Sequence, residues 1–277
     1  MTSRDYSKRI SKIDDIRDER VKLYTEYNEP QLFHINEPQS GIFIAETPMV
    51  IERAIGCGAE PISFFVESSA LGNEDVKRVL DETGEDIPVF EAKLSVINSI
   101  TGFNLTRGML AAFMRPNLRR PEDILRDGKV VAVLEDVVNP TNVGAIFRSA
   151  AALGVDGILL TTASTDPFYR RSARVSMGTV FMVPWSYIPK ESELTALLHD
   201  NGYTVISMAL SDKAVALNDP VLKGYDKRAV VFGAEGDGIS AKTLDGSDHI
   251  AMIPMKNGVD SLNVAAASAV TFWELCR

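Results

Sequence analysis

The sequence predicts an α/β protein with two domains: a smaller N-terminal α/β domain and a C-terminal domain built on a mostly parallel sheet. Short apolar segments alternate with helical segments along almost the whole chain, which is the order that α/β sheets require. In the second half these apolar segments are apolar throughout, as expected for parallel strands that are covered on both faces. Residues 116–128 contain two prolines and three arginines, and we expect them to form the linker.

The first domain is expected to cover residues 1–115. In residues 1–30 charged side chains alternate with isoleucine, valine and leucine, which predicts an amphipathic helix on the domain surface. The pattern after it predicts strands at residues 41–46, 62–68, 87–92 and 107–116. It predicts helices at residues 47–58, 73–83 and 93–101.

The second domain is expected to cover residues 129–277. Its predicted strands are residues 130–136, 157–161, 178–185, 203–210, 228–233 and 249–254. Its predicted helices are residues 141–154, 191–202 and 263–276. The last of them is small on every face over "AAASA", so we expect a neighbouring segment or a second subunit to pack closely against it.

Composition limits the class of protein. Hydrophobic residues make up 45% of the chain and charged residues 24%, which is ordinary for a globular protein, and no apolar run is long enough to span a bilayer. Two isolated cysteines predict neither a disulfide framework nor a zinc site. We therefore expect a cytoplasmic protein with no membrane partner and no metal.

Charge by itself does not predict a nucleic-acid partner. The formal net charge is −9, which argues against binding to nucleic acid through bulk positive charge. Arginines nevertheless cluster in two places, at Arg115, Arg119 and Arg120 and at Arg170, Arg171 and Arg174. Charge alone favours two solvated surface patches as the explanation of both clusters.

Polar residues are concentrated in three loops that follow strands of the second domain, where open parallel sheets bind ligands. The first loop contains Asn139 and Asn142. Helix capping explains the presence of one asparagine well, but it explains the presence of two poorly. Arg148 follows in an otherwise apolar helix, where a structural ion pair and a functional contact with an anion explain it about equally well.

The second and third loops suggest a ligand that is not a pyrophosphate. "VVFGAEGDGIS" is not the G-x-G-x-x-G pattern, and its Glu235 and Asp237 would repel phosphates. A neutral or cationic ligand such as S-adenosylmethionine meets that condition. In the third loop Ser261 and Asn263 flank Leu262, so both can converge on one ligand, or either can cap the helix that follows.

Together these loops carry a family resemblance. "NPTNVGAIFRSAAALGVDGILL", "VVFGAEGDGIS" and "IPMKNGVDSLNVAAASAV" resemble, in order and spacing, the three motifs of the SpoU-type (TrmH-like) RNA 2′-O-ribose methyltransferases. "YRRSARVSMGTVF" is similar to the segment between the first two motifs. The resemblance covers residues 130–277 and implies a trefoil knot in the C-terminal domain, an exception to the usual rule on threading.

The first domain is similar, more loosely, to the RNA substrate-binding domain of many members, with Thr47 where a glycine is usual. The resemblance implies an S-adenosylmethionine-dependent homodimer that methylates a ribose 2′-hydroxyl without a metal. This hydroxyl occurs in RNA, so the chemistry excludes DNA. The two-domain organisation favours ribosomal RNA by analogy, with tRNA as the alternative and a non-enzymatic RNA-binding factor as a further one.

The resemblance also implies roles for particular residues. It places at the reaction centre Asn142, Arg148, Glu235, Ser261 and Asn263. It assigns to donor binding Met208, Ala209, Leu210, Gly233, Ala234, Glu235, Gly236, Ile253, Met255, Ser261 and Leu262. Backbone contacts with RNA are expected from Arg115, Arg119, Arg120, Arg170, Arg171 and Arg174. Because arginine keeps its proton below pH ~12, we expect Arg148 to clamp the target phosphate and hydroxyl while neighbouring groups assist proton removal.

Overall fold

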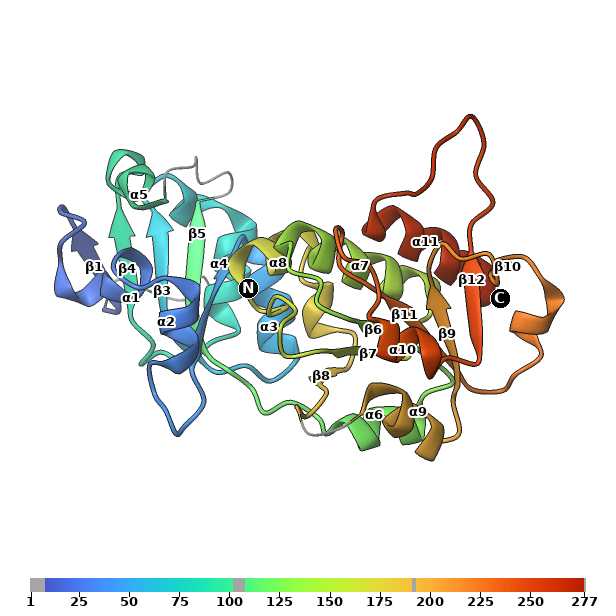
Figure 1. The fold of residues 1–277 in the computed structure, drawn as a ribbon. Coiled ribbons are helices and arrows are strands. Elements are labelled where there is room, and N and C mark those ends of the chain that lie inside the picture. Colours follow the sequence, from blue (N-terminus) through green and yellow to red (C-terminus); the bar gives the residue numbers. More distant parts are fainter. Residues whose placement is uncertain (1–7, 102–107, 191–192, 277) are drawn as a thin grey trace. The chain divides into compact units, whose positions relative to one another are not determined.

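The computed structural model describes residues 8–101, 108–190 and 193–276 (Figure 1). The chain divides into two compact units, which are described separately. Unit 1 comprises Met1–Asn117 with Phe168–Phe181, and unit 2 comprises Leu118–Pro167 with Met182–Arg277. This division differs from the expected consecutive domains, because residues 168–181 lie within the second domain's sequence and yet belong to unit 1.

Unit 1 contains a five-stranded sheet in the order β1-β4-β3-β5-β2 among the described residues. Its strands are β1 (Ile10–Ile13), β2 (Ile42–Glu46), β3 (Pro61–Glu67), β4 (Val89–Ala92) and β5 (Met109–Met114). β1, β4 and β3 are parallel, whereas β5 runs antiparallel to both β3 and β2. The four predicted strands of this half are confirmed within their described residues, and the sheet is mixed.

The amphipathic helix expected over residues 1–30 is wrong where the structure describes it, from residue 8 onward. The chain forms β1, a 3-10 turn at Glu19–Val21, and the short helices α1 (Lys22–Thr25) and α2 (Glu29–His34). Local hydrogen bonds divide this segment. The Asp18 side chain accepts from the Arg20 backbone, and the Asn28 side chain caps α2. Such side-chain to backbone bonds compete with a continuous helix.

The three helices predicted for unit 1 at residues 47–101 are confirmed within their described residues, and a helix that was not predicted lies in the inserted segment. They are α3 (Pro48–Gly56), α4 (Glu74–Asp81), α5 (Leu94–Thr101) and, in the inserted segment, α8 (Arg170–Val175). The strand expected at residues 178–185 is wrong. Met177 and Gly178 both have left-handed backbones, with φ of 54° and 82°, and a 3-10 turn follows at Thr179–Phe181. This turn ends any extended run before the short strand β8 (Trp185–Tyr187) of unit 2 begins.

Aromatic stacking holds the inserted segment in unit 1. The ring of Phe43, on β2, lies 5.2 Å from Phe113, 5.1 Å from Phe168 and 5.4 Å from Phe181, measured between centroids. Arg53 of α3 donates a hydrogen bond of 2.5 Å to the Met177 carbonyl oxygen. Residues 168–181 therefore complete the core of unit 1.

Unit 2 contains a seven-stranded sheet in the order β10-β12-β9-β11-β6-β7-β8 among the described residues, and every neighbouring pair is parallel. Its strands besides β8 are β6 (Val130–Leu134), β7 (Gly157–Leu160), β9 (Thr204–Met208), β10 (Val215–Ala216), β11 (Arg228–Phe232) and β12 (His249–Met252). The expected parallel sheet is confirmed, with β10 as an edge strand that the sequence did not predict.

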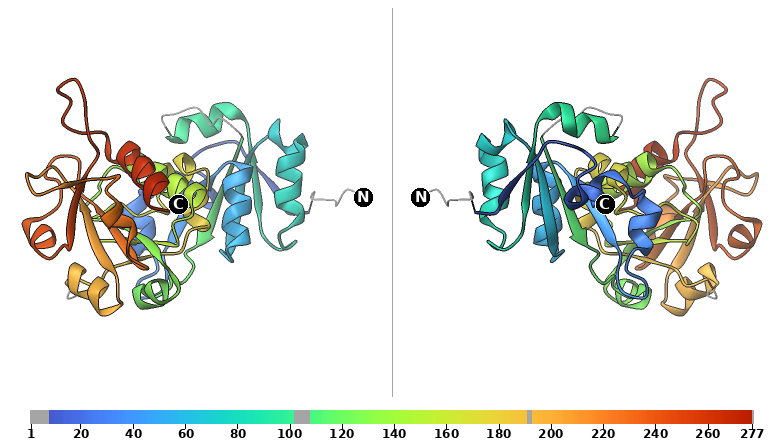
Figure 2. Two further views of the ribbon diagram at one scale, coloured as in Figure 1. Left: turned by 90° about the vertical axis from the view of Figure 1, so that its right-hand side faces the viewer. Right: turned by 90° about the vertical axis from the view of Figure 1, so that its left-hand side faces the viewer.

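Helices cover both faces of this sheet, as the apolar strands predicted (Figures 1 and 2). They are α6 (Pro121–Asp127), α7 (Pro140–Leu153), α9 (Leu194–Asp200), α10 (Ala241–Asp245) and α11 (Val264–Leu275). α7 packs against α11, while α6 and α9 share a core cluster on the other face. The expected linker at residues 116–128 is largely α6, because Ile124 and Leu125 are buried in that core.

The structure also bears on the expectations about membrane spans and about the fold that the resemblance implied. No helix in the described ranges is both long enough and apolar enough to cross a lipid bilayer. The parallel sheet agrees with the fold that the resemblance implied, and the trefoil knot stays a prediction.

Candidate functional site

Three neighbouring strands of unit 2 end at one cleft of about 400 Å³. The end of β9, the loop after β11 and the loop after β12 line it, and these strands are adjacent in the sheet. All eleven residues that were expected to bind the methyl donor lie in the lining: Met208, Ala209, Leu210, Gly233, Ala234, Glu235, Gly236, Ile253, Met255, Ser261 and Leu262. The structure brings them together, and donor binding itself stays a prediction.

The glycine loop after β11 is a tight turn that requires two of its glycines. The backbones of Ala234 and Gly238 exchange two hydrogen bonds of 3.1 Å, and Gly238 has a φ of 70°. A Cβ atom on Gly233 would lie 2.2 Å from the Gly238 carbonyl carbon, whereas Gly236 has open space. The turn therefore fixes the backbone that carries Glu235 and Asp237 at the cleft.

A chain of hydrogen bonds joins all three motifs beside this cleft. The Ala265 backbone donates to Asn263 Oδ1 over 3.0 Å, and Asn263 Nδ2 donates to Asn142 Oδ1 over 3.2 Å. Asn142 Nδ2 in turn donates to Glu235 Oε1. Each amide is oriented by the bond before it, so the N-terminus of α11 sets the direction of the whole chain and one oxygen of Glu235 is held in place.

The alternatives left open for the asparagines and for Ser261 are decided by these bonds. Asn139 is the cap of α7, since its side chain accepts from the Thr141 backbone over 2.9 Å. Asn142 is 7% exposed and belongs to the hydrogen-bond chain instead. The cap of α11 is Asn263, and Ser261 lines the cleft.

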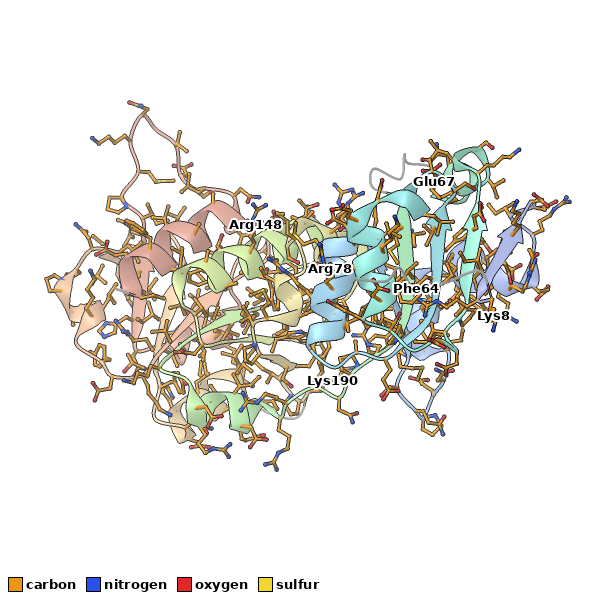
Figure 3. The ribbon with its side chains drawn as sticks, turned by 180° about the vertical axis from the view of Figure 1, so that it is seen from behind. Lys8, Phe64, Glu67, Arg78, Arg148 and Lys190 are labelled. Atoms are coloured by element: carbon orange, nitrogen blue, oxygen red, sulfur yellow. The ribbon has the colours of Figure 1, made fainter. Side chains whose placement is uncertain are left out.

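Arg148 lies apart from the other four residues of the expected reaction centre. It is exposed on α7 (Figure 3), six positions after Asn142. Six residues of α-helix correspond to about 9 Å along the axis and a different face. Arg148 does not line the cleft. Its apolar neighbours in sequence are on the buried side of α7, and the described residues provide no ion pair for it.

Three of the arginines that were expected to contact RNA lie on a helix that the sequence analysis did not predict. Arg170, Arg171 and Arg174 are on α8 in unit 1. Arg174 pairs over 3.4 Å with Glu46, whose side chain is 1% exposed. Burial lowers the pKa of Arg170, and the carboxylates of Glu46 and Glu29 partly oppose that shift.

The other arginine cluster also has partners inside the chain. The Arg115 guanidinium lies over the rings of Phe33 and Phe168, at 4.5 and 5.0 Å from their centroids. Arg119 pairs with Asp127 over 2.5 Å and Arg120 with Asp123 over 3.0 Å. These contacts explain the arginines structurally, and their role in RNA binding stays a prediction.

Sequence reasoning left several cleft residues out of the expected site. They are Phe232, Asp237, Gly238, Ile239, Leu244, Ala251, Met252, Asp260, Val264 and Ala267. Most are apolar residues at strand ends and at the start of α11, which resemble ordinary core residues in a sequence. Asp260 gave a signal, because it stands beside Ser261 in the polar third loop.

Comparisons with known proteins agree on one family. The model of the SpoU rRNA Methylase family matches residues 129–273. Uncharacterized tRNA/rRNA methyltransferases of Mycobacterium bovis and Mycobacterium tuberculosis are each 35% identical over 237 residues, which is 85% of this chain and 81% of theirs.

Two solved structures share the fold over nearly the whole chain. An AdoMet-bound rRNA methyltransferase from Sinorhizobium meliloti has a TM-score of 0.80 and 24% identity, covering 96% of this chain and 97% of its own. An RNA 2′-O ribose methyltransferase has a TM-score of 0.76 and 22% identity, covering 96% and 98%.

Proposed function

The chain is an RNA methyltransferase of the SpoU rRNA methylase family, and from this premise we propose that it transfers a methyl group from S-adenosylmethionine to a ribose 2′-hydroxyl. The observation that carries the proposal is the hydrogen-bond chain from Asn263 through Asn142 to Glu235, at the edge of the cleft. It brings together, beside the cleft, polar side chains from three motifs that are far apart in the sequence. Ribosomal RNA is the proposed target, and tRNA is the alternative.

The cleft suits S-adenosylmethionine in size and in chemistry. Its volume is within the usual range for small-molecule sites, and apolar side chains make up much of its wall. Glu235, Asp237 and Asp260 provide negative charge for a cationic ligand. When bound, S-adenosylmethionine supplies a methyl group on a sulfonium. The rRNA methyltransferase from Sinorhizobium meliloti, which shares the fold and has AdoMet bound, supports this donor.

We propose that Glu235 accepts the proton of the ribose hydroxyl. Asn142 holds one of its carboxylate oxygens, and Glu235 lines the cleft. A carboxylate fixed in this way is suited to general-base catalysis. Asn142 and Asn263 position Glu235 rather than react themselves. Ser261, which lines the cleft from the loop after β12, is proposed to orient the ribose.

We propose that Arg148 clamps the target phosphate. Its position on α7 limits how it can reach an RNA that is bound in the cleft. Since it does not line the cleft of its own chain, the RNA must extend from the cleft to α7, or a second copy of the chain must present its α7 there. We propose a homodimer through α11. Its Trp273 and Val270 are 51% and 41% exposed, whereas Phe272 and Leu275 are buried within their own chain.

Unit 1 is proposed to recognise RNA, and unit 2 to carry out the methyl transfer. A truncation that starts near residue 122 would test this poorly, because residues 168–181 would lose the rest of unit 1. The full-length protein should therefore be used for the test. We also propose that the protein acts on RNA in the cytoplasm.

Mapping of 2′-O-methyl sites in cellular RNA tests the proposal. Cells that lack the protein should lose a site in ribosomal RNA, and the wild-type protein should restore it while Glu235→Gln should not. Loss of a site in tRNA would establish the alternative target. A lost methyl group on a base would contradict the proposed chemistry, and restoration by Glu235→Gln would contradict the proposed proton acceptor.

A further inference from the structure

The charge of the cleft in unit 2 is entirely negative among the described residues that line it. Glu235 and Asp237 come from the loop after β11, and Asp260 comes from the loop after β12. The lining contains no lysine, arginine or histidine. Lys256 is on the same loop as Asp260 and is exposed, but it is not part of the lining.

Two of these carboxylates have no polar partner among the described residues. Asp237 and Asp260 are exposed and have no hydrogen bond or ion pair among the described residues, whereas Glu235 is held by Asn142. The tight turn from Gly233 to Gly238 fixes the backbone at Asp237. A ligand in the cleft therefore meets negative charge from two separate loops.

The walls beside these carboxylates strengthen their effect on a bound ligand. Leu210 and Leu262 line the cleft and are 61% and 40% exposed, so a ligand that fills the cleft covers them and displaces water. Removal of water lowers the effective dielectric constant and increases the attraction between opposite charges. Surface charges lining a concave site act together on a small ion.

The reaction under the proposed function changes the charge of the small molecule in this cleft. Methyl transfer breaks the carbon–sulfur bond, whose electron pair stays on sulfur, and forms a carbon–oxygen bond to the ribose. The hydroxyl proton leaves to Glu235 and then to water. The donor is a sulfonium with one positive charge more than the thioether product.

Resting on that proposed function, we propose that Asp237 and Asp260 make the cleft distinguish the donor from the spent product by charge. The sulfonium form is attracted to both carboxylates. The thioether loses this attraction when it forms, so the product is held more weakly and exchanges for fresh donor. Asp237 and Asp260 are thus specificity-determining residues for the donor and not proton carriers.

Isothermal titration calorimetry of the full-length protein tests this with three ligands. S-adenosylmethionine and S-adenosylhomocysteine differ in the sulfonium, and sinefungin carries a protonated amine near that position. The variants are Asp237→Asn, Asp260→Asn and their double mutant, which keep size and remove charge. Asp226→Asn is the matched control, because Asp226 is an exposed carboxylate of unit 2 outside the cleft.

At low salt the wild-type protein should bind S-adenosylmethionine and sinefungin several-fold more tightly than S-adenosylhomocysteine. Each substitution should weaken both cationic ligands by about three- to tenfold, since it removes one unit of opposite charge from the cleft. The affinity for S-adenosylhomocysteine should change less than twofold, and high salt should narrow the difference between the ligands. Asp226→Asn should behave as the wild type.

Equal or tighter binding of S-adenosylhomocysteine by the wild type would overturn the proposal. So would variants that weaken all three ligands equally, because that result indicates a damaged loop rather than a lost charge. Failure of the proposed function looks different, since then none of the three ligands binds.

Discussion

Glu46 ends β2 in unit 1 and Glu235 follows β11 in unit 2, yet the two carboxylates have opposite surroundings. Glu46 is buried and pairs with Arg174, and the aromatic cluster of Phe43 lies in the same unit. Glu235 is held by one amide and faces an open cleft. The difference shows that Glu46 stabilises the fold of unit 1, whereas Glu235 remains available to a ligand.

Arg174 and Arg148 also have opposite surroundings. Arg174 belongs to a cluster that was expected to contact RNA, and the structure gives it a buried partner. Arg148 was expected to need an anion, and the structure leaves it exposed on α7. An arginine in a sequence therefore does not reveal its role until the burial of its partner is known.

The largest effect is expected from Phe43→Ala in unit 1. Removal of this ring leaves a cavity among Phe113, Phe168 and Phe181 and should cost about 3–5 kcal/mol. Both tryptophans are in unit 2, so their fluorescence reports on unit 2 while circular dichroism reports on the whole chain. In a urea titration, circular dichroism should show an additional unfolding transition at a lower urea concentration than in the wild type. The midpoint of the fluorescence transition should not change.

The control is Leu94→Ala, because Leu94 is an exposed residue of unit 1 and its loss should be nearly neutral. If Phe43→Ala shifted both probes equally, the two units would unfold as one, and the contrast drawn between them would lose its basis.

The second-largest effect is expected from Arg148→Ala, which should lower turnover without lowering stability. Removal of a positioned cation at a reaction centre lowers kcat by about 10²–10³-fold. An exposed arginine without an ion pair in the described chain should leave the melting temperature and the donor affinity unchanged. Arg148→Lys should recover little activity, because it lacks the planar fork. Arg126→Ala, on the surface of α6, is the control.

Normal turnover of Arg148→Ala on its cellular RNA target would remove Arg148 from the reaction centre. That result would restrict the proposed reaction centre to Glu235 and Ser261, which line the cleft, with Asn142 and Asn263 as positioning residues.

Arg174→Ala should destabilise unit 1 by about 2–3 kcal/mol, because it removes the ion-pair partner of the buried Glu46 carboxylate and leaves it the weaker electrostatic attraction of Arg170. The estimate is below that for a fully buried pair since Arg174 is 33% exposed and water can reach its site. The double variant with Glu46→Gln should recover part of the loss, as measured by circular dichroism in urea. A variant that kept its stability and lost RNA affinity would restore Arg174 as an RNA contact.

Gly233→Ala should affect the cleft alone, through strain of about 1–3 kcal/mol in the turn after β11. Its new methyl group would clash with the Gly238 backbone, and calorimetry should show weaker donor binding with little change in unit 1. Gly236→Ala is the matched control, because its Cβ meets no atom within 4 Å. Equal losses in both variants would mean that the turn is not what shapes the cleft.

The smallest effect is expected at the exposed pair of Arg17 and Asp15 in unit 1. The Arg17 guanidinium, hydrogen-bonded to the carboxylate, lowers the pKa of Asp15 from 3.8 to about 2. A lowered carboxyl pKa adds stability above pH 3.8 that is lost as the pH falls toward 2. Arg17→Ala should return the pKa of Asp15 toward its usual value in an NMR titration and leave the melting temperature within error.

A shift of the melting temperature as large as that of Arg174→Ala would contradict the contrast between exposed and buried pairs. It would mean that the segment before β2 is held by its surface charges.

Much of the fold could be predicted because the signals are local. Apolar runs bounded by glycine, proline and capping residues gave β2 to β7, β9, β11 and β12, and Asn139 capped α7 as one alternative had it. The failures arise where the structure depends on more than the local pattern. Residues 10–13 and 178–185 were misassigned because short strands and left-handed turns depend on partners and on backbone angles that a pattern of hydrophobicity does not contain.

By itself the sequence determined the family motifs and the parallel sheet, since each depends on residue type and spacing along one strand or loop, and the eleven cleft residues were identified through the resemblance that those motifs carry. Only the tertiary structure decided which groups meet. It joined Asn142, Glu235 and Asn263, placed residues 168–181 in unit 1, and left Arg148 exposed. The physical reason is that burial and hydrogen bonding are properties of pairs of segments far apart in the chain, and these pairs exist once the sheet has brought its carboxyl ends together.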